Sequence, residues 1–163
     1  MEDKMKTLVV YYSLEGNTKY AAELIAEKTG ADLLRIEPEK AYPDGKLSKF
    51  IWGGKSAVMA ETPALMPYDT DISSYGCIIL GFPVWASNVA PPVRTFVRDN
   101  DIKGRKIGFF ACQAGTGAEK AFGKLRAAIG IEKEDASLVL IDPKSKKDPE
   151  NEKRISEFCD KLL

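Results

Sequence analysis

Short apolar runs rich in β-branched residues alternate with amphipathic runs of helical spacing along most of this 163-residue chain. The first apolar run, Thr7–Tyr12, has no polar alternation, as expected for a strand that is buried on both faces of a sheet. The next run, Thr18–Thr29, places Ala21 and Ile25 on one helical face and stops at Gly30. Because strands and helices alternate in this way, the chain is predicted to form a parallel sheet covered by helices.

The same alternation continues to the end of the chain. Further strands are predicted over Asp32–Glu37, Cys77–Phe82, Lys106–Cys112 and Ser137–Asp142, and further helices over Pro91–Asn100, Ala118–Ile129 and Pro149–Leu162. Between residues 38 and 74 the pattern is less regular: Leu47, Phe50, Ile51 and Val58 keep helical spacing, but Gly53-Gly54 should kink that helix. With right-handed crossovers, the predicted fold is a single α/β domain over residues 1–163, with a five-stranded parallel sheet and helices on both faces. Ligands of such sheets bind beyond the carboxyl ends of the strands, where the strand order reverses.

The composition excludes several classes of function. The chain contains no histidine, which rules out Ser-His-Asp and Cys-His catalysis and removes the commonest ligand of catalytic zinc. Lys plus Arg and Asp plus Glu each number 24, so net charge favours neither a nucleic-acid nor a membrane partner. Cys77, Cys112 and Cys159 form no C-x-x-C pair and indicate neither a disulfide framework nor a metal site. No segment approaches the ~20 apolar residues that span a bilayer, and we expect a cytoplasmic protein.

The loop after the first predicted strand carries groups that suit a phosphate. It reads Ser13-Leu14-Glu15-Gly16-Asn17-Thr18, with two hydroxyls, an amide and a flexible glycine at the start of a helix. Backbone N–H groups at a helix start point toward a bound anion, and the helix dipole favours negative charge there. The loop has no Lys or Arg, so it is predicted to hold a phosphate without ion pairing. The same residues are also explained by a helix that Asn17 or Thr18 caps.

The segment after the third predicted strand, residues 81–92, suits a flat aromatic ring. Trp85 stands between Pro83 and a small polar run, where it can lie against such a ring and add roughly 0.5–1.5 kcal/mol of stacking. Backbone groups of Ala86 to Asn88 are placed to bond the polar edge of the ring. Alternatively, Trp85 only covers the edge of the core.

The loop after the fourth predicted strand, residues 112–118, contains two glycines. Gly115 and Gly117 allow the backbone to approach a ligand closely, although a glycine-rich turn before a helix explains them equally. All three loops leave the carboxyl ends of neighbouring strands. Their convergence predicts one ligand site with a phosphate loop, an aromatic platform and a close-approach loop.

At these residues the sequence resembles the flavodoxin family. Residues 9–18 look like the first strand and phosphate loop of that family, and residues 81–96 resemble the G-x-P-V-W-A…A-P-P-x-R-T-F segment of a group of small bacterial flavodoxin-like proteins. The resemblance covers essentially the whole chain and implies a flavodoxin-like three-layer sandwich, the strand order 2-1-3-4-5, FMN as cofactor and a redox role. By matching positions it places Ser13, Glu15, Gly16, Asn17 and Thr18 around the phosphate, Pro83, Val84, Trp85, Ala86, Ser87 and Asn88 on one side of the isoalloxazine, and Gln113, Ala114, Gly115, Thr116 and Gly117 on the other.

Three functions are compatible with this resemblance. In each of them the protein is expected to be a monomer or a homodimer. In the first, it is an electron carrier that cycles FMN with redox partner proteins. In the second, it is a reductase in which NAD(P)H reduces FMN and FMN reduces a quinone, azo or nitro compound. Dedicated flavodoxin carriers are typically strongly acidic, so the neutral charge of this chain counts against the carrier and leaves room for the reductase. The carrier is nevertheless the role that we prefer. The third is a flavin-free binding domain. In either redox role the flavin supplies the chemistry, and we expect no catalytic side chains and no metal.

Overall fold

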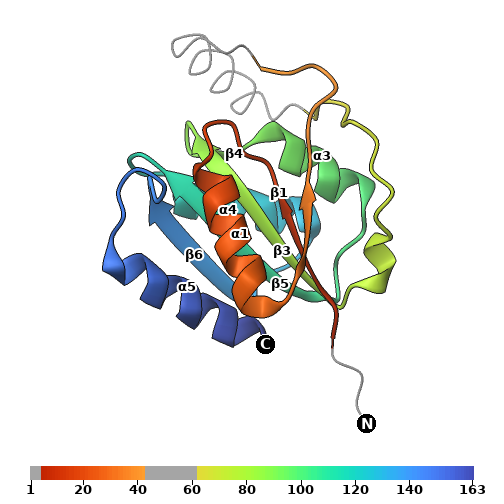
Figure 1. Ribbon diagram of the computed structural model, residues 1–163. Coiled ribbons are helices and arrows are strands. Elements are labelled where there is room, and N and C mark those ends of the chain that lie inside the picture. The colour runs from red at the N-terminus through yellow and green to blue at the C-terminus, as the bar shows by residue number, and fades with distance from the viewer. Residues whose placement is uncertain (1–4, 43–61) are drawn as a thin grey trace.

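The computed structural model describes residues 5–42 and 62–163 and shows a central sheet between two layers of helices (Figure 1). Its elements are β1 (Thr7–Tyr11), α1 (Asn17–Thr29), β2 (Asp32–Arg35), a 3-10 turn η1 (Ile72–Ser74), β3 (Cys77–Trp85), β4 (Asn88–Val89), α3 (Pro91–Asp99), β5 (Lys106–Gln113), α4 (Ala118–Ile129), β6 (Ala136–Ile141) and α5 (Pro149–Leu162). The helix predicted around residues 47–58 lies outside the described residues. Within residues 5–42 and 62–163, every helix is too short or too polar to span a bilayer.

The sheet has the strand order β2-β1-β3-β5-β6, and neighbouring strands on this path are parallel. Since β5 and β6 are the fourth and fifth predicted strands, the predicted order 2-1-3-4-5 is confirmed. One strand was not predicted. β3 continues past Phe82 to Trp85 and turns back into the short strand β4, which pairs with it antiparallel. The structure therefore adds one short antiparallel strand to the predicted five-stranded parallel sheet.

The reason lies in the turn between β3 and β4. Ala86 and Ser87 have φ angles of 50° and 61°, so both residues occupy the left-handed region that a tight two-residue hairpin turn requires. Such turns are usually signalled by Asn-Gly or Asp-Gly, and Ala-Ser carries no such signal. The chain therefore keeps a strained turn directly beside the predicted aromatic platform.

Each face of the sheet buries its own pair of helices. On one face, α1 and α5 pack through Ile25 and Phe158 onto Val9 and Ile79 of the sheet. On the other face, α3 and α4 cover an aromatic-rich core that includes Phe82, Phe96, Phe109 and Phe122. The sheet is thus covered on both sides, and only its edges and strand ends reach solvent.

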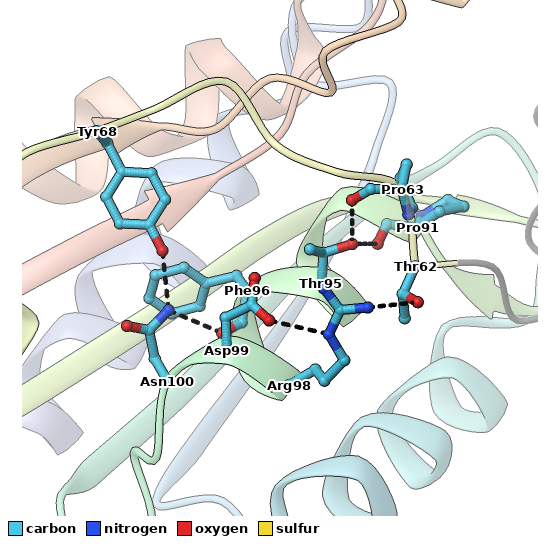
Figure 2. Close-up of polar contacts among 9 residues, drawn as sticks. All are labelled: Thr62, Pro63, Tyr68, Pro91, Thr95, Phe96, Arg98, Asp99 and Asn100. Atoms are coloured by element: carbon cyan, nitrogen blue, oxygen red, sulfur yellow. Dashed lines mark hydrogen bonds and ion pairs between the residues drawn. The ribbon is translucent and has the colours of Figure 1, made fainter.

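The chain that leads into β3 is fastened along α3 (Figure 2). The Thr95 hydroxyl donates to the Pro63 carbonyl at 2.7 Å, and the Arg98 guanidinium donates to the Thr62 hydroxyl at 2.8 Å. At the end of the helix, the Asn100 amide donates to the Tyr68 hydroxyl at 2.9 Å. These bonds hold residues 62–68 along α3, so that this segment reaches η1 and β3 in a fixed path.

The strand register brings the predicted loops to one edge of the sheet, the upper edge in Figure 1. Tyr11, the last residue of β1, is paired with Gly81, and Pro83 of β3 is paired with Cys112 of β5. The strand order reverses between β1 and β3: from β1 the chain continues to β2 on one side of β1, and then crosses to β3 on the other side of β1. This is the place where a doubly wound sheet opens a ligand crevice.

Candidate functional site

A cavity of about 280 Å³ opens at this edge. Residues from all three predicted loops line it, together with three that were not predicted as site residues: Leu14, Cys112 and Asp142. The lining comprises Ser13, Leu14, Glu15, Asn17, Thr18, Pro83, Trp85, Ala86, Cys112, Gln113, Ala114 and Asp142. The structure therefore brings the phosphate loop, the aromatic platform and part of the close-approach loop to one space.

The remaining predicted residues lie around this cavity in different ways. Ser87, Thr116 and Gly117 line a neighbouring depression of about 380 Å³, which shares Gln113 with the first. Asn88 is buried behind the hairpin turn. Gly16, Val84 and Gly115 line neither space.

The phosphate loop is shaped by the buried Ser13 side chain. Its Oγ accepts from the N–H of Gly16 at 3.2 Å and from the N–H of Lys19 at 3.1 Å, which draws the loop into the start of α1. Gly16, with φ 99°, is the residue that precedes α1, so neither Asn17 nor Thr18 caps the helix as the alternative interpretation proposed. Within the described residues, the N–H groups of Asn17 and Thr18 have no acceptor. They remain available to an anion at the helix start.

Two cations that the sequence analysis missed contact this loop. Arg35, at the end of β2, donates through Nη2 to the Ser13 carbonyl at 2.9 Å. Lys144, in the loop after β6, donates its backbone N–H to Asn17 Oδ1 at 3.0 Å, and its side chain crosses Gly16. The loop itself contains no Lys or Arg, as noted from the sequence, but its neighbours supply both. No local pattern signals these contacts, since Lys144 and Asn17 lie 127 positions apart in the chain.

The aromatic platform is braced by two tyrosines. The ring of Trp85 meets Tyr12 edge to face at a centroid distance of 5.9 Å and Tyr42 at 5.3 Å, with interplanar angles of 87° and 86°. Burial raises the pKa of Tyr12 far above its usual value, so this hydroxyl stays neutral. Trp85 is half-buried and also packs against the core, so it covers the core edge and lines the cavity at the same time.

The hairpin turn beside Trp85 is held from two directions. The Asn88 side chain donates to the Ala86 carbonyl at 2.7 Å and accepts from the Lys124 ammonium of α4. From the other side, Ser87 packs so tightly on Gly117 that a Cβ at Gly117 would lie 2.6 Å from the Ser87 Oγ. These contacts join the second and third loops into one wall.

Two unpredicted groups complete the cavity wall. Burial raises the pKa of the Cys112 thiol to about 12, although the neighbouring Thr18 hydroxyl offsets part of that effect. The thiol is therefore neutral and behaves as a small apolar group. The Asp142 carboxylate adds a negative charge on the side of β6, where the Lys146 ammonium lies 3.7 Å away.

These features define a class: a doubly wound α/β sandwich whose ligand cavity is formed by three loops at the switch point between β1 and β3. A model of the flavodoxin family matches residues 6–151. The chain therefore belongs to the flavodoxin family.

Solved structures with the same architecture include a protein from Bacteroides uniformis assigned as a flavoprotein, which is 25% identical over 97% of this chain and 99% of that chain, with a TM-score of 0.79. The FMN complex of a flavoprotein from Lactobacillus acidophilus is 21% identical over 93% and 99% of the two chains, with a TM-score of 0.71. The two-electron reduced flavodoxin of Megasphaera elsdenii is 19% identical over 96% and 97%, with a TM-score of 0.55. None of the curated proteins compared with this chain matches it.

Proposed function

We propose that this chain binds FMN in the cavity at the carboxyl ends of β1, β3 and β5 and takes part in electron transfer. The observation that carries the proposal is the lining of that cavity, which combines residues of the α1 start with the aromatic ring of Trp85. The likeness of the fold to the FMN complex of the Lactobacillus acidophilus flavoprotein supports it.

The groups at the phosphate loop fit a phosphate ester. The free N–H groups of Asn17 and Thr18 lie at the positive end of the α1 dipole, where a doubly charged anion is favoured. The hydroxyl of Thr18 is buried beside them. The ordered turn around Ser13 means that these donors are already oriented before a ligand arrives.

The rest of the wall fits a flat, partly polar ring. Trp85 offers a braced aromatic face, and Gln113 and Ala114 line the cavity from the neighbouring loop. When bound, FMN supplies one- and two-electron redox chemistry. The chain binds and orients it, and the carboxylates of Glu15 and Asp142 disfavour the accumulation of further negative charge in the cavity.

Carriage of electrons between redox partner proteins is the role that we favour. Ala86 and Ala114 line the cavity and are exposed. Because both side chains are small and uncharged, a partner protein that docks there could come close to a flavin ring. The three cysteines are unpaired and buried, which fits the reducing cytoplasm. The depression beside the cavity supports a second candidate, an NAD(P)H-dependent reductase of quinone, azo or nitro compounds, because it offers space for a second small molecule next to Gln113.

The first experiment is a titration of the purified protein with FMN, followed by visible absorption and flavin fluorescence. Wild type should bind FMN. Combined Asn17→Ala and Thr18→Ala substitutions should weaken binding at the phosphate end, and Trp85→Ala should weaken it at the ring end. Ser137→Ala, on the exposed side of β6, is the control and should bind as wild type does. Failure of wild type to bind FMN would refute the proposal and leave a flavin-free binding domain.

The second experiment separates carrier from reductase. FMN-loaded protein is mixed anaerobically with NADPH, first alone and then with an added flavodoxin reductase. Bleaching of the flavin only after the reductase is added supports the carrier role. Direct bleaching by NADPH, with steady turnover on a quinone, would replace that role by the reductase.

A further inference from the structure

The side chain of Lys144 lies over the phosphate loop. An ideal Cβ built on Gly16 would be 3.0 Å from the Lys144 Nζ and 3.4 Å from its Cδ, so the lysine occupies the space that a side chain at position 16 would need. Gly16 also has φ 99°, a conformation that favours glycine. Gly16 therefore leaves room for the Lys144 side chain where it crosses the start of α1.

The backbone under Lys144 is held firmly. Its N–H donates to Asn17 Oδ1, and the preceding Pro143 is buried. The Asp142 carbonyl accepts from the N–H groups of Ser145 at 3.1 Å and Lys146 at 2.8 Å, which closes a tight turn around the lysine. The loop between β6 and α5 therefore fixes the backbone of Lys144 beside the start of α1, while the residue itself is exposed.

The charge of Lys144 is poorly placed unless an anion is present. The ammonium lies at the start of α1, where the helix dipole is already positive and the first turn contains no acidic residue. Within residues 5–42 and 62–163, no carboxylate comes within 4.0 Å of it, whereas Lys146 of the same loop pairs with Asp142. A positive side chain beside the positive end of a helix favours a negative group near both.

We propose that Lys144 is the cation that recognises the phosphate of the bound flavin and makes this site select FMN over riboflavin. The inference rests on the proposed function and names a residue outside the three predicted loops. In this proposal the cavity holds the flavin, and the N–H groups of Asn17 and Thr18 donate to its phosphate. Lys144 is not part of the cavity lining, but its ammonium lies over Gly16 and adds a charge-assisted contact to the phosphate there. Riboflavin lacks the phosphate and gains nothing from this lysine.

The contribution of Lys144 to FMN binding depends on how exposed its ammonium group is. Because the ammonium is in contact with solvent, water and salt screen its attraction to a phosphate, and the contribution is smaller than for a buried pair. The phosphate carries close to two negative charges at neutral pH, which offsets part of the screening. We expect Lys144→Gln to weaken FMN binding about three- to tenfold at low salt. The backbone bond to Asn17 survives this substitution, so the phosphate loop keeps its shape.

The test compares the dissociation constants of FMN and riboflavin for wild type, Lys144→Gln and Lys147→Gln. Lys147 lies in the same loop, and its replacement changes the net charge by the same amount. Lys144→Gln should weaken FMN binding and leave riboflavin binding unchanged. The loss of FMN affinity that this substitution causes should become smaller at high salt. Lys147→Gln should bind both ligands as wild type does.

Three other outcomes overturn the inference. Equal weakening of FMN and riboflavin would assign Lys144 a structural role only. An equal loss in Lys147→Gln would mean that the net charge of the loop matters and not the placement of Lys144. Unchanged FMN binding in Lys144→Gln would remove the lysine from recognition while the proposed function stands. If wild type binds neither flavin, the proposed function itself fails, which the other outcomes do not imply.

Discussion

At the scale of single residues, Gly117 shows how closely two of the loops are fitted together. It has φ 112°, and an added Cβ would lie 2.6 Å from the Ser87 Oγ and 2.9 Å from the Ser87 Cα. A side chain at position 117 is disfavoured by the positive φ angle. It would also overlap the Ser87 Cα, a backbone atom that cannot shift without moving the hairpin turn. Glycine at 117 is thus needed for contact between loops, whereas Gly115 has nothing within 4 Å of its ideal Cβ.

We therefore expect Gly117→Ala to lower the free energy of unfolding by about 2–4 kcal/mol, from strain and overpacking together. Gly115→Ala is the matched control and should change it by less than about 0.5 kcal/mol. Urea unfolding of the two variants measures the difference. Equal effects would show that Ser87 does not pack on Gly117 in solution.

A second residue-scale prediction concerns the strained hairpin turn. Ala86 is exposed and has φ 50°, so Ala86→Gly removes the steric penalty of the left-handed conformation. That relief outweighs the extra chain entropy of glycine and should raise the free energy of unfolding by up to about 1 kcal/mol. Ala114→Gly, at an exposed position without a positive φ, should instead lower it slightly. Thermal unfolding of both variants tests the sign, and a loss of stability in Ala86→Gly would contradict the turn geometry.

At the scale of elements, local patterns were enough to predict most of the sandwich. The bounds of α4 and α5 agree with their hydrophobic spacing, since Phe122 and Leu125 or Phe158 and Leu162 face the sheet as that spacing requires. The extension of β3 and the strand β4 escaped prediction because Ala86-Ser87 has no turn signature and is held by distant groups. Lys144 and Arg35 were missed for the same reason: they reach the phosphate loop from the ends of other strands. Sequence reasoning found the loops of the site but not the residues that tertiary contacts bring to them.

The end of α4 is joined to the start of β6 by an ion pair that is mostly buried. The Arg126 guanidinium donates to the two carboxylate oxygens of Glu134 at 2.7 and 3.1 Å, and the Glu134 side chain is 2% exposed. Glu134→Ala leaves the arginine without its partner and should lower the free energy of unfolding by about 2–4 kcal/mol. The exposed Arg98–Asp99 pair provides the comparison, because Asp99→Ala should cost less than about 1 kcal/mol. Similar losses in denaturant unfolding would mean that burial does not strengthen the Arg126–Glu134 pair.

At the scale of the whole molecule, stability should fall in alkali. The Tyr75 hydroxyl donates to Asp32 Oδ2 at 2.6 Å, and this bond together with burial raises the pKa of Tyr75 from 10.0 to about 12. A raised pKa in the folded state means that the stabilisation is complete below pH 10 and is lost as the pH rises toward 12. We expect the free energy of unfolding to decrease over this window and to decrease less steeply in Tyr75→Phe. Parallel pH profiles of wild type and variant would contradict the contribution of Tyr75.

On our proposal, the molecule holds FMN at the carboxyl ends of the strands, where the loops after β1, β3 and β5 meet. The most direct measurement is the map of backbone amide shifts in NMR spectra of the protein as FMN is added. We expect shifts concentrated in residues 13–18, 83–88 and 113–117, with a further shift at Lys144, and almost none at the opposite end of the strands around Tyr75 and Gly104. Shifts centred elsewhere, or no saturable shifts at all, would contradict it.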